Sequence, residues 1–198
     1  MVWAKEGTNT LVSTSDTIYV STNSLKFNMY MTHQIGSGNI NSRFRANSDT
    51  SSSVYADRTS INGGADTERS PNNDGWITAE VNLANNSDDK FLVGFYCDIS
   101  GEEKLFMGWN CDRHDATSSV APERVEFVAK YVPSPDASIS EFGALNVGSG
   151  DYTTGSNFSV LTGDETEIVT LQDGTIFEET DTNKAYIWSS SSETWTQL

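Results

Sequence analysis

The stretch 90-KFLVGFYCDISGEEKLFMGWNC-111, followed after a polar loop by 122-PERVEFVAKYV-132, decides the fold. Apolar residues alternate with their neighbours in all three runs, which is typical of strands with two distinct faces. A short Gly-containing turn at residues 100–102 joins the first two runs as a hairpin. We predict that this hairpin and the third strand form the spine of an antiparallel β-sandwich.

The two cysteines test the register of that hairpin. With the turn at residues 100–102, Cys97 lies opposite Leu105 and Cys111 lies opposite Phe91. The two thiols are then roughly 20 Å apart along the ladder at ~3.3 Å per residue. A disulfide needs Cα atoms within about 7 Å, so we predict two reduced, buried thiols and no metal bound to them.

The rest of residues 1–165 carries more short strands. The clearest candidates are residues 18–20, 25–34, 41–46, 54–61, 76–83, 139–147 and 158–161. Polar turns separate them, a long polar loop spans residues 62–75, and no amphipathic helical pattern appears. This spacing predicts an all-β, antiparallel, jelly-roll-like sandwich for residues 1–165.

From residue 166 the sequence pattern changes. Three short runs with large apolar residues, residues 174–179, 184–188 and 194–198, are separated by polar turns. They predict a three-stranded β-meander as a C-terminal appendage, residues 166–198. Some 30 residues bury too little surface to be stable alone. We therefore expect the meander to dock on the sandwich, on another subunit or on another protein.

The charge balance excludes one class of partner. The chain has 12 Lys and Arg against 28 Asp and Glu, a formal charge of −16. Such a field repels phosphate backbones, so nucleic-acid binding is not expected. The N-terminus lacks a basic region followed by an apolar run, and no stretch approaches a membrane span. We expect no membrane association and folding in a cytoplasm, unless the sequence is that of a mature form.

No pattern of catalytic residues emerges. The histidines are His33, at a strand end, and His114, in the run Asp112-Arg113-His114-Asp115. A Ser/His/Asp triad needs a histidine held by an orienting group in a pocket, and in a chain this rich in loop serines a chance match is easily found. The adjacent pair Glu102 and Glu103 sits on a turn, where neighbouring side chains project apart, unlike glycosidase carboxylates. We expect no enzyme activity and no catalytic or metal-binding residues.

Acidic loops make bound Ca²⁺ an alternative to consider. Residues 72–74, 85–89 and 112–115 are rich in Asp and Asn, which supply the oxygens that Ca²⁺ binds. Ordinary turn chemistry explains the same residues, and no EF-hand spacing is present. No cofactor is expected, and bound Ca²⁺ stays an alternative.

Several motifs follow one another along the chain, at residues 55–58, 62–66, 101–105, 121–131 and 139–163. Their order resembles a family of β-sandwich structural proteins of tailed phages and related viruses, common in marine virus genomes. Residues 173–188 with Trp195 are similar to a small C-terminal module of virion proteins. The resemblance implies a structural protein of the virion surface, assembled in the host cytoplasm. It implies a place in capsid decoration, turret, tail, fibre or baseplate, beside a major capsid or tail protein.

Large aromatic residues are the candidates for contact with partners. They are Tyr152, Phe177, Tyr186, Trp188 and Trp195. Aromatic side chains are enriched at protein interfaces, and we expect these to bind other copies in a homo-oligomer, a trimer or pentamer by analogy with the class. The alternative is a carbohydrate- or receptor-binding adhesion module of the same fold, in which they stack on host surface glycans.

Overall fold

The computed structural model describes most of the chain, in ranges separated by short gaps: residues 2–22, 27–38, 40–51, 53–69, 75–77, 90–98, 103–112, 121–135, 137–164, 173–179, 184–189, 191–192 and 194–198. Strands, turns and loops make up all of these ranges. None of them contains a helix, so none contains a helix that could cross a membrane. Two compact units are present, one from Ala4 to Gly163 and one of Asp164–Leu198 with Met1–Trp3.

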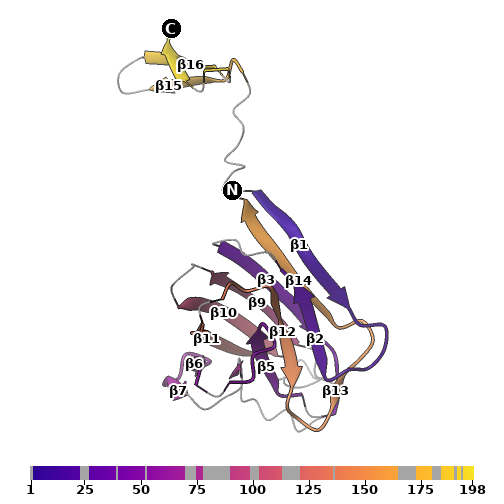
Figure 1. The fold of residues 1–198 in the computed structure, drawn as a ribbon. Helices are drawn as coiled ribbons and strands as arrows, with labels where there is room; N and C mark the ends of the chain where they lie inside the picture. The colour runs from indigo at the N-terminus through magenta and orange to yellow at the C-terminus, as the bar shows by residue number, and fades with distance from the viewer. Residues whose placement is uncertain are drawn as a thin grey trace. The chain divides into compact units, whose positions relative to one another are not determined.

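The larger unit is a sandwich of two main sheets (Figure 1). The eight-stranded sheet has the order β1 (Val2–Thr10), β14 (Asn157–Asp164), β3 (Phe27–Gln34), β9 (Lys90–Cys97), β10 (Lys104–Asp112), β11 (Glu123–Tyr131), β6 (Tyr55–Ile61) and β7 (Thr67–Arg69). The four-stranded sheet has the order β2 (Thr17–Ser21), β12 (Glu141–Asn146), β5 (Ser42–Ala46) and β8 (Trp76–Ile77). A small ladder joins β4 (Gly36–Ser37) to β13 (Asp151–Tyr152).

The strand order is that of a jelly roll. The outermost strands β1 and β14 are neighbours, and successive inner pairs follow as β2 with β12, β3 with β9, and β5 with β8. This nested pairing rolls one long antiparallel ladder into two facing sheets. Two further strand pairs interrupt it. β6 and β7 lie between β5 and β8 in the chain, β10 and β11 lie between β9 and β12, and all four widen the eight-stranded sheet.

Aromatic rings join the two sheets. Phe142 of the small sheet meets Tyr30 of the large sheet edge-on, with ring centroids 4.8 Å apart. Phe44, Phe158 and Tyr96 surround this pair and are almost fully buried. A core this thin gains most of its stability from a few large side chains, because each aromatic ring buries about 150–250 Å².

A buried ion pair closes one end of the sandwich. Lys104 Nζ lies 3.3 Å from Asp98 Oδ1, and both side chains are almost fully buried. The other oxygen of Asp98 accepts a hydrogen bond of 2.7 Å from the backbone amide of Ile139, next to β12. The pair therefore ties the turn end of the β9–β10 hairpin to the segment that leads into β12 of the opposite sheet.

The predicted hairpin register is confirmed, since Cys97 pairs with Leu105 and Cys111 pairs with Phe91. Both thiols are free, as predicted. Their predicted burial is wrong, because Cys97 is half-buried and Cys111 is exposed. The alternation showed that the two cysteines share a face of the sheet. Their face turned out to be the one that points away from the core.

Most other strand predictions are confirmed within two residues, including 18–20, 41–46, 54–61 and 139–147. For residues 25–34 the described strand begins at Phe27, and for 76–83 only Trp76–Ile77 lies within the described residues. The sequence prediction missed β1, which alternates weakly, and β7, which lies in the segment predicted as a loop.

The second unit contains the predicted three-stranded meander. Its strands are β15 (Ile176–Glu179), β16 (Lys184–Ser189) and β17 (Thr194–Gln197), paired in chain order. Trp188 lies directly opposite Trp195, with ring centroids 5.3 Å apart.

Candidate assembly surface

The outer face of the eight-stranded sheet is the side that points away from the four-stranded sheet. Backbone pairing aligns its side chains in rows that run across the strands, each named here after its residue on β10. The Leu105 row is Phe27, Cys97, Leu105, Lys130 and Ala56. The Met107 row is Leu161, Met29, Phe95, Met107, Val128, Arg58 and Glu68.

Two further rows complete the face. The Trp109 row is Ser159, Met31, Val93, Trp109, Glu126 and Ser60. The Cys111 row is Asn157, His33, Phe91, Cys111 and Arg124. Read along the strands, β3, β9 and β10 present an apolar block, with His33 at its margin. β11 presents Arg124, Glu126, Val128 and Lys130, three charges around one valine.

Several apolar side chains of this face are strongly exposed. The exposed fractions are 51% for Phe91, 51% for Leu105, 47% for Met107, 42% for Trp109 and 52% for Val128. With about 150–250 Å² for a large apolar side chain, these five expose on the order of 450 Å² together. The largest apolar patch of a typical monomer covers about 300–600 Å² and is often functional, so this patch is a candidate interaction site.

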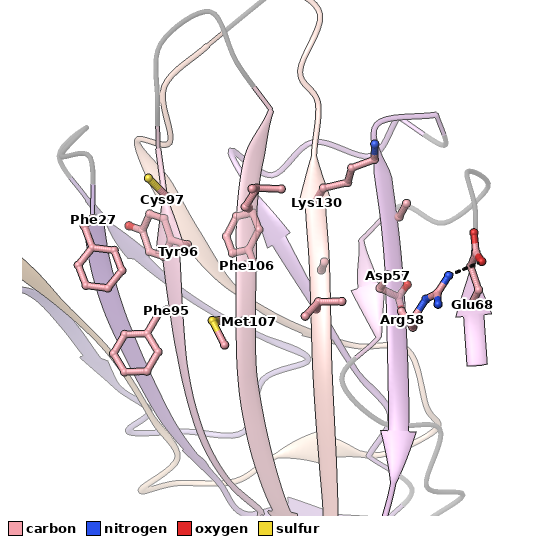
Figure 2. Close-up of a pocket in the computed structure, with 14 residues that line it drawn as sticks. Phe27, Asp57, Arg58, Glu68, Phe95, Tyr96, Cys97, Phe106, Met107 and Lys130 are labelled. Carbon is pink, nitrogen blue, oxygen red and sulfur yellow. Dashed lines mark hydrogen bonds and ion pairs between the residues drawn. The ribbon is translucent and has the colours of Figure 1, made fainter. Parts of the chain in front are cut away.

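A groove of about 490 Å³ is hollowed into the face (Figure 2). Phe27, Phe95, Leu105, Met107 and Val128 form its apolar walls, all from the Leu105 and Met107 rows. Arg58 and Lys130 lie at its charged end, where Figure 2 shows Arg58 bonded to Glu68. The groove runs across the strands and is open to solvent.

Ion pairs line the β11–β6–β7 side of the apolar block. Arg58 lies 2.8 Å from Glu68 and 3.6 Å from Asp66. Lys130 lies 3.0 Å from Glu103, and Arg124 lies 3.3 Å from Glu126. All these side chains are at least 44% exposed, so each pair contributes little to stability, about 0–1 kcal/mol.

Tyr152 does not belong to any surface, so its prediction as an exposed contact residue is wrong. The side chain is fully buried, and its hydroxyl donates a hydrogen bond of 3.0 Å to Ser42 Oγ. Burial raises the pKa of this hydroxyl above its usual range. The sequence context, a Gly- and Ser-rich loop, suggested exposure, but the short β13 strand pairs with β4 and carries the ring inward.

The four predicted contact residues of the meander lie close together. Phe177 and Trp195 are 52% and 40% exposed, whereas Tyr186 and Trp188 are half-buried. The rings of Phe177 and Trp195 meet edge-on at 6.2 Å. These aromatics can offer a ring to a partner or to a flat ligand.

Among the described residues, the candidate catalytic side chains His33 and Glu103 do not converge. His33 is exposed on the outer face beside Phe91, and Glu103 pairs with Lys130. His114, Glu102 and most of the acidic loops considered for Ca²⁺ lie outside the described residues. Within the described ranges, no three His, Cys, Asp or Glu side chains are grouped as a metal site requires.

The sequence prediction missed the outer face as a candidate site, although a signal for it was present. In residues 91–97 both alternating sets are apolar, Phe91, Val93, Phe95 and Cys97 on one side and Leu92, Gly94 and Tyr96 on the other. An antiparallel strand with one solvated face shows polar residues on that side. Apolar residues on both faces indicate that something covers each of them.

Comparison of the chain with protein-family models, with curated proteins and with solved structures found no match.

Proposed function

We propose that this chain is a non-enzymatic structural protein of a virus particle, located on its surface and working as a homo-oligomer. The apolar outer face of the large sheet is the observation that carries the proposal. A contiguous exposed block of Phe, Leu, Met, Trp and Val side chains has the composition of an interface core, in which aromatic residues and methionine are enriched. An apolar surface of this kind is expected to be covered by a partner when the protein functions.

The jelly-roll topology supports the same function. Capsid proteins use this architecture, as lectin domains do, so the fold alone does not decide between them. The motif resemblance to virion β-sandwich proteins favours the particle. A capsid decoration, turret, tail, fibre or baseplate component would contact copies of itself and a major capsid or tail protein. It would assemble in the host cytoplasm.

The test uses particles of a virus that carries this sequence. An antibody raised against the full-length chain should label purified particles in electron microscopy, and a preimmune serum should not. The chain should also be found by mass spectrometry in particles that have passed through a density gradient. Particles that lack the chain, while infected cells contain it, would contradict the proposal.

Adhesion to host glycans is the second candidate, and the exposed rings of Phe177 and Trp195 favour it. Aromatic faces stack on sugar rings, and the meander presents these two side by side. A glycan array probed with the labelled full-length chain tests this function. Binding that disappears in Trp195→Ala, while the oligomer mass from light scattering is unchanged, supports adhesion. Absence of glycan binding in the wild-type chain excludes it for the glycans displayed.

A further inference from the structure

We infer that two copies of this chain pack with their outer faces together, around a two-fold axis that runs along the Met107 row. This inference rests on the proposed self-assembly and names its partner, its surface and its geometry. Two-fold contacts are the commonest in homo-oligomers, and they bring one surface patch against itself. The outer face must therefore be complementary to itself, and the rows allow that to be examined.

The axis exchanges the Leu105 row with the Trp109 row. Each strand then crosses its own counterpart in the opposite direction, so Met107 meets the Met107 of the second copy. On β11, Val128 lies on the axis, and Lys130 comes to lie opposite the Glu126 of the second copy. Because of the symmetry this charge pair forms twice. Lys130 and Glu126 are 48% and 45% exposed, so both can take a second partner besides their own Glu103 and Arg124.

The twist of the sheets still allows Lys130 to pair with Glu126 of the second copy. Aligned sheets cross at about 30°, and Lys130 and Glu126 each lie two residues, roughly 7 Å, from the axis. The crossing displaces them by roughly 3 Å, which is within reach of a flexible lysine side chain.

The shapes of the two rows are complementary as well. The groove is hollowed between the Leu105 and Met107 rows, and Trp109 stands exposed in the row on the other side of the axis. The two-fold rotation places Trp109 of each copy over the groove of the other, against Leu105. Aromatic side chains that fill a partner's pocket are the usual centres of interface affinity.

An in-plane two-fold axis parallel to the strands, along β10, gives a poor contact. It places β9 over the β11 of the second copy and keeps each row in place. Cys97 would then cover Lys130, and Phe91 would cover Arg124. Cations would be buried against apolar side chains without a carboxylate opposite them, which is costly.

Charge favours self-contact through this face. The chain carries a formal charge of −16, so two copies repel over most of their surfaces. On the outer face and its rim the described ion pairs combine three cations, Arg58, Arg124 and Lys130, with four carboxylates, those of Asp66, Glu68, Glu103 and Glu126. This near balance of charge suits the outer face to contact with a second copy. The five exposed apolar side chains supply about half of the ~800 Å² that each partner buries in a standard interface. The elementary oligomer would then be a dimer in place of a trimer or pentamer.

Sedimentation velocity of the full-length chain over a range of concentrations tests the inference. The wild type should sediment as a dimer, and Met107→Asp should be monomeric, with a dissociation constant raised at least 100-fold, because the two carboxylates would face each other on the axis. Val12→Asp is the matched control, since Val12 is 90% exposed and lies off the outer face. It should leave the dimer unchanged. A wild type that stays monomeric, or a Met107→Asp dimer of wild-type strength, overturns the inference.

Charge exchange tests the axis itself with variants at exposed positions, and circular dichroism checks that they fold. Lys130→Glu and Glu126→Lys should each weaken the dimer about tenfold or more, and the double variant should recover to within about threefold of the wild type. A double variant as weak as the single ones overturns this axis. Neither result bears on the labelling of particles by the antibody, so the proposed function stands or fails separately.

Discussion

The ring of Tyr30 lies directly against the backbone of Gly94. A methyl group built on Gly94 would come within 2.4 Å of Tyr30 Cζ and within 2.5 Å of its hydroxyl oxygen. Gly94 pairs across the strands with Gly108, where a methyl group would meet Phe127 Cζ at 2.7 Å. Two neighbouring glycines thus leave room for two large rings in the thin core of the sandwich.

Gly94→Ala should lower the free energy of unfolding by roughly 1–3 kcal/mol, because the added methyl group forces the buried Tyr30 ring or its strand to move. Urea unfolding followed by tryptophan fluorescence measures this change. In a Tyr30→Leu background the same substitution should cost less, since the clashing ring is gone. An equal cost in both backgrounds would show that the ring is not the cause.

Asp98→Ala should lower the free energy of unfolding by about 3–5 kcal/mol, because it leaves the ammonium group of Lys104 buried without its carboxylate. Urea unfolding again provides the measurement. The double variant Asp98→Asn/Lys104→Met should be more stable than Asp98→Ala. It buries no lone charge, and the asparagine oxygen can still accept the hydrogen bond from Ile139. A double variant less stable than the single one would contradict this explanation.

Asp49 should make stability depend on pH in the acid range. Burial disfavours its charge, but hydrogen bonds from Ser51 and from the Tyr131 hydroxyl outweigh this and hold the pKa of the carboxyl below its usual value. The stabilisation is therefore present above about pH 4 and is lost as the pH falls through the lowered pKa. Asp49→Asn should lower the urea midpoint at pH 6, with a smaller difference at pH 3. A difference that stays constant with pH would exclude this role.

The buried tyrosines should resist ionisation. Burial raises the pKa of four hydroxyl groups above their usual range, those of Tyr55, Tyr96, Tyr131 and Tyr152. Absorbance at 295 nm should show them still protonated at about pH 11 in the folded chain, whereas all seven tyrosines titrate near pH 10 in urea. Because the unfolded chain loses these protons first, stability should fall as the pH rises above about 10. Seven tyrosines titrating near pH 10 in the folded chain would contradict the burial.

Much of the fold could be predicted from local patterns. The hairpin register followed from the position of one turn, and the meander followed from three short apolar runs with turns between them. The strand pairs that make the jelly roll, such as β1 with β14, join residues far apart in the chain. No local pattern reveals them. β1 itself alternates weakly, because as an edge strand it buries little.

The candidate site was harder to predict, because alternation shows that two sets of side chains face opposite ways but does not show which set is covered. Phe91, Leu105 and Met107 are large and apolar, yet they point away from the core, while Gly94 and Gly108 of the same strands face it. Tyr30 and Phe127 come from other strands and fill the space that the glycines leave. Which of the two sets faces the core is therefore decided by tertiary packing.

The pairing of β1 with β14 has a consequence for biosynthesis. Thr8 bonds to Ser159, a residue that leaves the ribosome 151 positions later. Through most of translation the first strand therefore has no ladder to join, and the emerging β3–β9–β10 face is already apolar. Sheets that close only at the end of synthesis fold slowly and expose adhesive surfaces meanwhile. Expression at low temperature, or translation of several copies of the chain from one mRNA, should therefore raise the yield of folded protein.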